Sequence, residues 1–442
     1  MKHTSKLLIS TFLSCMTLPF IASAQSTDLL SLYKKAENYD AEIFAAQSAY
    51  LAEQEGQKIE FAGLLPTVNA RASLSHTNSN GLSSSDNSYK QKNYYLSLSQ
   101  PLLNLPTWHS VSASEQRTLL AQVDYLTAQQ NLILNVATAY FKVLREQENL
   151  RSDHSQEAAV KRQYEQAKEQ FDVGLIAITD VHEAKASYDA SQTARIRSEG
   201  NLTIALENLS RITGEYTNEL HGLNPDFPIA MDTSISAEKW LESAQNHNLG
   251  IKIAHYAYKA SEALLKSKKA AHLPTVSLDA NYSNSAFTNY YAAGNDDSES
   301  SELAITLNMP LYSGGATQAG VRQARHQVAE AKHNLTLAQR QAKIETRTEF
   351  ISLKTNIQTV ESLQQNIVSR ESALEATREG YKVGTRNIVE VLDAERNYFT
   401  ALRDYANARF DFVESSLRIK RAAGTLSVKD IEALNAWLSP GQ

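Results

Sequence analysis

The chain has 442 residues, with 43 Lys plus Arg against 49 Asp plus Glu and a formal net charge of −6. This balance argues against a nucleic-acid-binding protein, which needs a basic surface, and a hydrophobic share of 42% argues against a disordered chain. Only 16 Gly and 9 Pro interrupt the sequence, which predicts long, unbroken elements.

The N-terminus has the features of an export signal. Two lysines precede a short apolar run at 7–21, and Ala-Ser-Ala at 22–24 forms a small-residue cleavage site. Residues 1–24 are therefore predicted to be a signal peptide. A membrane anchor is the alternative, but the run is short for a spanning helix. Lipidation of Cys15, the only cysteine, is disfavoured by its flanking residues. Cleavage leaves a mature chain without disulfides or thiolate metal sites.

The first half of the sequence changes its period near Pro66. Residues 27–62 are rich in Ala, Glu, Lys and Leu and predict a helix. From Val68 to Leu74 apolar residues occupy every second position, and the same alternation returns at 94–99 after a polar loop. Both alternating runs predict strands.

A long helix is predicted next. Residues 108–171 contain neither Pro nor Gly, which allows a helix of about 64 residues, and at a rise of ~1.5 Å per residue it would extend roughly 95 Å. Apolar residues recur every seven positions, which indicates a coiled coil. They are Leu119, Leu126, Ile133 and Tyr140, and in the second half Leu353, Val360, Ile367 and Leu374. A cytosolic coiled-coil rod is the alternative, and the signal and strands argue against it.

The second half repeats the first with a period of about 210 residues. Leu-Pro-Thr-Val at 65–68 recurs at 273–276, and Phe-Asp-Val-Gly-Leu at 171–175 recurs as Tyr-Lys-Val-Gly-Thr at 381–385. Alternation also returns after the second Pro, at 275–282 and 303–308. Because order and spacing are kept, two equivalent units per chain are expected.

The four strands are predicted to be about ten residues each, the length that a tilted strand needs to cross a bilayer. Four strands cannot close a barrel, and an open edge is not tolerated in lipid, so several chains would have to pool their strands. A soluble hairpin pair with one hydrated face is the alternative. Aromatic residues near the strand ends suit an interfacial girdle. These are Tyr89, Tyr94, Tyr95, Tyr282, Phe287, Tyr290, Tyr291 and Tyr312.

Four segments of the chain are distinctive. They read Phe-Asp-Val-Gly-Leu-Ile-Ala-Ile-Thr-Asp-Val (171–181), Val-Gly-Thr-Arg-Asn-Ile-Val-Glu-Val-Leu-Asp-Ala (383–394), Leu-Ile-Leu-Asn-Val-Ala-Thr-Ala-Tyr-Phe (132–141) and Ala-Asn-Ala-Arg (406–409). Together they resemble the TolC family of outer-membrane efflux proteins. The resemblance extends over essentially the whole mature chain.

This resemblance implies a mainly α-helical homotrimer whose protomers each give four strands to one shared twelve-stranded outer-membrane barrel, above a coiled-coil periplasmic tunnel. The implied regions follow the chain. Residues 25–63, 105–213, 236–272 and 314–424 belong to the helical barrel, 64–104 and 273–313 to the membrane strands and external loops, and 214–235 and 425–442 to an equatorial region.

The resemblance also implies a gate at the periplasmic end. Tyr381 is expected to donate a hydrogen bond to Asp180, and Arg386 to bind Asp180 and the Thr179 region of a neighbouring protomer. A further family bond does not carry over, because its two positions hold Gln163 and Arg378 here.

The turns next to this gate are the implied adaptor contacts. Their residues are Val173, Gly174 and Leu175 in the first unit and Val383, Gly384 and Thr385 in the second. From the residues alone they are turn glycines that reverse two long helices.

Glu390 and Asp393 lie three residues apart on one helix face. The resemblance places them as the pore-constriction carboxylates, which would make the pore prefer cations. A solvated helix face is the alternative from the residues alone. Glu183 occupies the repeat position of Asp393.

The implied function is a passive exit duct for multidrug efflux and type I protein secretion, opened by a periplasmic adaptor and an inner-membrane RND or ABC transporter. No cofactor, metal or nucleic acid is expected. No enzyme motif is recognised: His182-Glu183 lacks the second His of a zinc helix, because position 186 is Ala. A periplasmic coiled-coil adaptor or scaffold without a pore is the alternative function.

Overall fold

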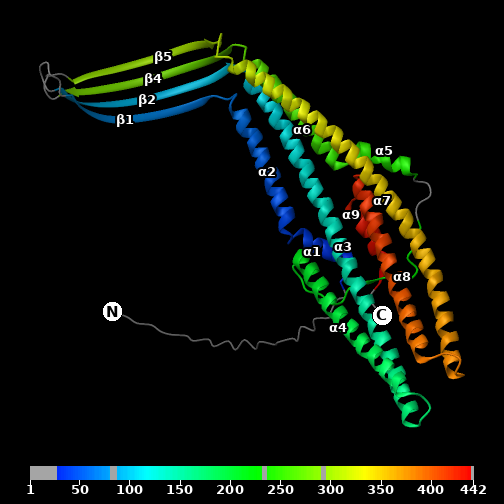
Figure 1. Ribbon diagram of the computed structural model, residues 1–442. Coiled ribbons are helices and arrows are strands. Elements are labelled where there is room, and N and C mark those ends of the chain that lie inside the picture. Colours follow the sequence, from blue (N-terminus) through cyan, green and yellow to red (C-terminus); the bar gives the residue numbers. More distant parts are fainter. Residues whose placement is uncertain (1–26, 80–86, 231–235, 290–294, 440–442) are drawn as a thin grey trace, which may run out of the picture.

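The computed structural model describes residues 27–79, 87–230, 236–289 and 295–439. Long helices form a rod, and a sheet projects from one end of it (Figure 1). The predicted signal peptide, residues 1–24, lies outside the described residues. No helix among the described residues combines the length and the apolar character that crossing a membrane requires.

The first helical stretch is two helices, where the sequence predicted one over 27–62. Helix α1 spans Leu29–Glu37 and α2 spans Ala41–Ala62. The break comes from Asp40, whose carboxylate accepts hydrogen bonds from the backbone amides of Glu42 and Ile43 and so begins a new helix. The interruption lets α1 turn into the core while α2 follows α3.

Two helical hairpins form the rod. In the first, α3 (Leu105–Asp172) and α4 (Ile178–Thr213) pair, and in the second, α7 (Ala316–Lys382) and α8 (Ile388–Ala422) pair. Helix α3 confirms the predicted long helix and begins three residues earlier, because Asn104 caps it through the amide of Thr107. Shorter helices complete the fold: α5 (Ala237–His247), α6 (Leu249–Ala270) and α9 (Val428–Asn435).

The heptad residues are buried only along part of the rod. Ile133 and Tyr140 of α3 are 3% and 0% exposed, whereas Leu119 and Leu126 are 37% and 41% exposed. The part of α3 nearer the sheet therefore leaves its heptad leucines partly exposed on the surface of the protomer.

The main sheet has the order β1-β2-β4-β5 and is antiparallel throughout. Its strands are β1 (Thr67–Ser79), β2 (Asn87–Leu103), β4 (Thr275–Asn289) and β5 (Asn295–Asn308). They have 13 to 17 residues, more than the predicted ten, because backbone ladder bonds continue past the point where the alternating apolar pattern stops. A second, two-stranded sheet pairs β3 (Gly222–Leu223) with β6 (Leu438–Ser439).

The main sheet has two chemically different faces. Val68 pairs across with Leu98, which pairs with Ala280, and these share the apolar face. The neighbouring positions, among them Asn69, form the polar face. The predicted alternation is confirmed.

The predicted aromatic girdle needs a correction. Tyr94 and Tyr282 lie on the apolar face, but Tyr89, Tyr95 and Phe287 lie on the polar face by register. The rings of Tyr89 and Phe287 contact each other there, with centroids 6.1 Å apart. Successive residues of a strand point to opposite faces, so the position of an aromatic residue in this alternation decides its face, and its closeness to a strand end does not. Tyr290 and Tyr291 lie outside the described residues.

The main core sits midway along the rod, where α1 and α9 pack with the middle of α3 and the C-terminal parts of α4 and α8. Tyr140, which is fully buried, donates a hydrogen bond of 2.6 Å to the backbone oxygen of His221. This core ties the equatorial segments to the rod and leaves the rod's far end to a separate, smaller cluster.

Candidate functional site

Each helical hairpin reverses at a left-handed glycine. Gly174 has φ +77° and Gly384 has φ +78°. In both turns the glycine amide and the next amide bond back to carbonyls of the preceding helix: Leu175 to Gln170, and Thr385 to Gly380. This is the Schellman arrangement, which glycine supplies without steric cost.

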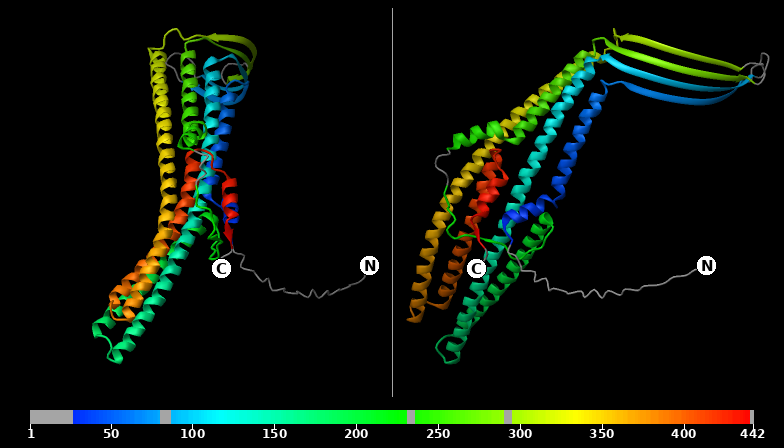
Figure 2. Two further views of the ribbon diagram at one scale, coloured as in Figure 1. Left: turned by 90° about the vertical axis from the view of Figure 1, so that its right-hand side faces the viewer. Right: turned by 180° about the vertical axis from the view of Figure 1, so that it is seen from behind.

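The two turns lie at the same end of the molecule, away from the sheet (Figure 2). Their apolar side chains point outward: Val173, Leu175 and Val383 are 71%, 74% and 75% exposed. Nothing lies within 4 Å of a methyl group placed on either glycine. The turns are therefore open surfaces with apolar side chains.

A small apolar cluster joins the two hairpins just above these turns. It contains Val160, Ala167, Ala184, Ile388 and Leu392, which come from α3, α4 and α8. The aromatic rings that pack against it include that of Tyr381 from α7. All four rod helices therefore meet at this cluster, and Tyr381 is the contribution of α7.

Tyr381 links α7 to α3. Its hydroxyl donates to the side-chain oxygen of Gln170 at 3.0 Å, which corrects the expected bond to Asp180. Asp180 stays near: burial first, and the negative charge of Asp180 second, raise the pKa of Tyr381 above its usual value of 10.0. Within one chain, a neutral amide on α3 is closer to the phenol than the carboxylate at the start of α4.

Arg386 binds within its own turn. Its guanidinium donates to Glu390 at 2.6 Å, one helical turn further along α8. Gly380 leaves room for the Arg386 stem, because a methyl group at position 380 would stand 2.7 Å from Cγ of Arg386. The expected bond from Arg386 to Asp180 and Thr179 of a neighbouring protomer stays a prediction.

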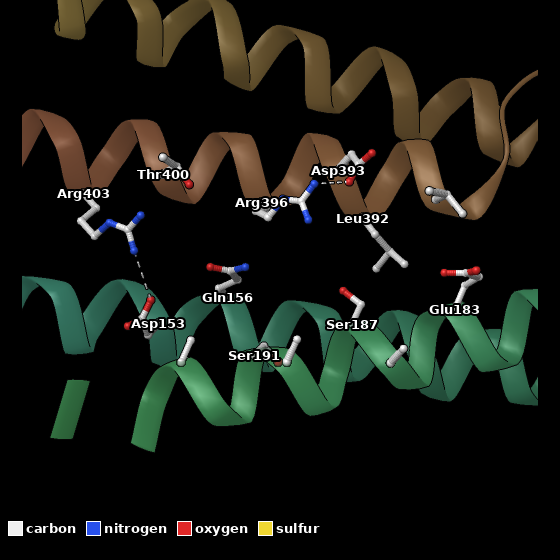
Figure 3. A pocket seen from close by; sticks show the side chains of 14 residues that line it. Asp153, Gln156, Glu183, Ser187, Ser191, Leu392, Asp393, Arg396, Thr400 and Arg403 are labelled. Atoms are coloured by element: carbon white, nitrogen blue, oxygen red, sulfur yellow. Dashed lines mark hydrogen bonds and ion pairs between the residues drawn. The ribbon is translucent and has the colours of Figure 1, made fainter. Parts of the chain in front are cut away.

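Asp393 also has a cationic partner, Arg396, which is three residues further along α8. Both line a cavity of about 430 Å³ between α4 and α8, together with Glu183. Figure 3 shows Arg396 reaching toward Asp393, while Glu183 lies at one end of the cavity on α4. The two predicted constriction carboxylates are thus each paired with an arginine: Glu390 with Arg386 of the turn before α8, and Asp393 with Arg396 of α8.

Two ion pairs near the gate were not foreseen from the sequence. Arg378 of α7 binds Glu395 of α8, whose side chain is fully buried. Arg403 of α8 lies 3.8 Å from Asp153 of α3, and Ser198 of α4 also donates to Asp153. The one feature of the sequence that could have indicated the first pair is the arginine at position 378, where the chain departs from the family. Its partner, Glu395, is 17 residues away in the sequence. Among the described residues no cluster of three or more His, Cys, Asp or Glu is arranged to hold a metal.

The sequence profile described as "Outer membrane efflux protein" matches residues 32–215 and 240–425. The chain belongs to the outer membrane efflux protein family. The two matched stretches together hold both helical hairpins and all four strands of the main sheet. The resemblance stated from the sequence is confirmed, and this efflux protein is an outer-membrane protein that extends into the periplasm.

Characterised relatives match over nearly the full length. Outer membrane protein TolC of Vibrio cholerae serotype O1 is 32% identical over 438 residues, which cover 98% of this chain and 99% of the relative. TolC of Escherichia coli K12 is 32% identical over 95% of this chain and 87% of the relative. The proteases secretion protein PrtF of Dickeya chrysanthemi is 28% identical over 94% of this chain and 92% of the relative.

Solved structures share the fold of this efflux protein. A crystal structure of CusC aligns with a TM-score of 0.79 at 18% identity and covers 90% of this chain and 92% of CusC. The CmeC outer membrane channel of Campylobacter jejuni aligns with a TM-score of 0.76 at 17% identity and covers 98% of both chains. The elongated helical rod with a projecting sheet is therefore a fold that this chain shares with solved structures.

Proposed function

We propose that three copies of this efflux protein assemble a passive channel through the outer membrane into the periplasm. The observation that carries the proposal is the four-stranded sheet, whose outer strands β1 and β5 each pair on one side only within the described chain. Its apolar face is exposed: Leu303, Ile305 and Leu307 of β5 are 74%, 71% and 65% exposed. If three such sheets close one twelve-stranded barrel in lipid, each open edge pairs with the edge of a neighbouring sheet and the apolar face contacts the lipid.

The helices support the same assembly. Leu337, Ile344 and Ile351 recur every seven residues on α7 and are 63%, 60% and 63% exposed. A heptad stripe of this kind is a coiled-coil seam that needs a partner helix, and we assign it to the neighbouring copy. Helices α3 and α7, of 68 and 67 residues, would carry the tunnel roughly 100 Å from the membrane at ~1.5 Å per residue.

The proposed regions follow these elements. Residues 64–104 and 273–313 would form the barrel strands and external loops, and the helical segments 25–63, 105–213, 236–272 and 314–424 the tunnel. The equatorial region would comprise 214–235 and 425–442, of which 231–235 and 440–442 lie outside the described residues. The matching order of elements in the two halves supports two repeated units.

The gate is proposed at the hairpin junction. The bond from Tyr381 to Gln170 holds the α7–α8 hairpin to α3, and Arg386, Thr179 and Asp180 lie at the same end, where they would face the next copy. Opening then consists of an outward movement of the α7–α8 hairpin that breaks the Tyr381 bond. The buried ion pair inside that hairpin would let it move as one body.

Glu390 and Asp393 remain our candidates for the constriction. Because each is paired with an arginine, the constriction would carry less net negative charge than two free carboxylates per copy. We therefore expect a weaker cation preference than the carboxylates alone would give.

The partners are proposed from the relatives, some named for efflux and some for protease secretion. A periplasmic adaptor would contact the exposed turns, Val173–Leu175 and Val383–Thr385, and an inner-membrane RND or ABC transporter would supply energy and substrates. The channel itself would use no cofactor and carry out no chemistry. The exposed apolar side chains at the turns are what such a contact needs.

Single-channel conductance in planar bilayers tests the gate. The purified wild type is compared with a variant carrying Tyr381→Phe and Arg386→Ser. Loss of the phenol donor and of the guanidinium removes the link to α3 and the proposed link to the next copy. We expect small openings in the wild type and several-fold larger ones in the variant.

The matched control is Lys382→Ser. Lys382 neighbours Tyr381, and its partner within the described part of the chain is Glu379 of the same helix; both side chains are well exposed. The control should conduct like the wild type. Equal conductance in wild type and double variant would keep the channel and discard the gate, whereas failure of well-folded protein to insert would discard the channel.

A further inference from the structure

The apolar face of the main sheet changes character along its strands. The row nearest the helices that crosses all four strands is apolar throughout: Val68, Leu98, Ala280 and Leu303. Three rows further out, Lys92 stands between Leu74 and Ala286, and in the next row Lys90 stands between His76 and Thr288. On β2, cationic side chains therefore begin directly after the apolar and aromatic positions of the same face.

The distance to this change matches a membrane. On β4, Val276 stands opposite Leu307 and Ala286 stands opposite Lys92 of β2. The positions of this face between them are apolar or aromatic except Asn284, which pairs with Glu299 of β5. Ten residues at ~3.3 Å, tilted by ~40°, give a height of about 25 Å, which is the apolar height of membrane barrels. Lys92 thus lies at the rim of the proposed membrane zone, and Lys90 lies one row beyond it.

Among the described residues, the acidic residues of this face lie on its far edge strand. Asp297 and Glu299 are on β5, which is separated from β2 by β4, so about 10 Å of sheet divides them from Lys92. Glu299 also accepts a hydrogen bond from Tyr282. Lys90 and Lys92, on β2, therefore lie two strands away from both of these carboxylates.

We propose that Lys90 and Lys92, with His76 beside them, bind the phosphate groups of lipids in the outer leaflet. This inference rests on the proposed membrane barrel. Lysine stems lie along apolar surface while their ammonium groups reach the polar boundary, and ammonium groups bind phosphate as strong charged donors. Apolar rows directly below would contact the acyl chains of the same lipid, so one molecule meets both surfaces.

The test measures lipid retention by native mass spectrometry. Purified wild type and a Lys90→Gln plus Lys92→Gln variant are each mixed with detergent micelles containing lipid A, a phosphorylated glucosamine lipid. Parallel samples contain the dephosphorylated lipid with the same acyl chains. We expect the wild type to prefer the phosphorylated lipid by about tenfold, and the variant to lose most of that preference.

Arg71→Gln is the matched control. Arg71 is a cation on a neighbouring strand, but it pairs with Tyr95 and therefore lies on the polar face. It should retain lipid like the wild type. An inorganic phosphate competitor separates lipid from free anion: it should displace little of the lipid.

Three results would overturn the inference: an unchanged preference in the lysine variant, equal retention of dephosphorylated lipid by the wild type, or complete displacement by inorganic phosphate. Bilayer conductance of the same samples keeps the proposed function separate. A lysine variant that inserts and conducts but still prefers phosphorylated lipid refutes only the lipid site. A wild type that neither inserts nor binds lipid refutes both.

Discussion

The buried ion pair between Arg378 and Glu395 gives the sharpest stability prediction. Glu395 is fully buried on α8, while the Arg378 side chain on α7 is 43% exposed. One carboxylate oxygen of Glu395 and Nε of Arg378 have no partner among the described residues. The pair is therefore held mainly by the one contact between Arg378 Nη2 and the other carboxylate oxygen.

Replacing Arg378 by Met leaves a carboxylate buried without a cation. Breaking a buried pair in this way costs on the order of 3–5 kcal/mol, and we expect about 3 kcal/mol because water reaches the exposed part of Arg378. The double variant Arg378→Met plus Glu395→Met removes both charges and should lie near the wild type, since replacing a whole buried pair by apolar groups is close to neutral.

The local loss of stability is measured as faster hydrogen exchange of the backbone amides in α7 and α8, followed by mass spectrometry. This measurement avoids a global unfolding experiment, in which assembly would contribute to the apparent stability. Arg378→Met should speed exchange of these amides by roughly a hundredfold, and the double variant should restore most of the protection. Lys382→Met is the control, because the exposed pair of Lys382 with Glu379 is worth less than about 1 kcal/mol.

The reasoning fails if Arg378→Met changes protection by less than about threefold, which would mean that Glu395 does not depend on its cation. It also fails if the double variant is as unprotected as Arg378→Met. In that case the loss would come from packing of the arginine stem, and charge pairing would not be the cause.

Three further predictions follow from the core and the turns. In thermal unfolding, Gly424→Ala should destabilise the protein by several kcal/mol and Gly174→Ala by about 1 kcal/mol. Both glycines have positive φ, but of the two only Gly424 lacks room for a methyl group, which would stand 2.2 Å from the backbone oxygen of His247. Equal losses of stability in the two variants would contradict this. Tyr140→Phe should cost roughly 1–2 kcal/mol, since it removes the donor to the His221 carbonyl, and an unchanged melting temperature would argue against that bond. Burial, aided by Glu37 and Tyr125, raises the pKa of Tyr33 from 10.0 to about 12. Because the phenol then ionises at a lower pH in the unfolded chain than in the folded one, the stability of the protein falls as pH rises from 10 to 12. Tyr33→Phe should lessen that fall, and an identical pH profile of stability in the variant would refute the prediction.

Local patterns predicted the elements well because their causes are local. The absence of Pro and Gly over 108–171 allowed one helix, and α3 is that helix. Alternation from Val68 to Leu74 set the face of each strand residue, and the register confirms it. Where a short polar side chain acted on its own neighbours, as Asp40 does in starting α2, composition over a long window missed the break.

The gate shows the limit of that reasoning. The resemblance placed Tyr381 beside Asp180, but the phenol bonds to Gln170, 211 residues away in the sequence. Which acceptor it reaches depends on how α7 lies against α3, and there the ring of Tyr381 packs against the small cluster that contains Ile388 and Leu392. Side-chain partners across packed helices are decided by such packing.

The sequence by itself determined the long helix α3, the strand faces, the turn glycines and the family, because each depends on residue type and spacing along the chain. Only the tertiary structure decided which charges pair between helices. Arg378 of α7 meets Glu395 of α8, and Arg403 of α8 meets Asp153 of α3. Burial and the mutual rotation of helices control those contacts, and neither is encoded in the spacing of residues on one helix.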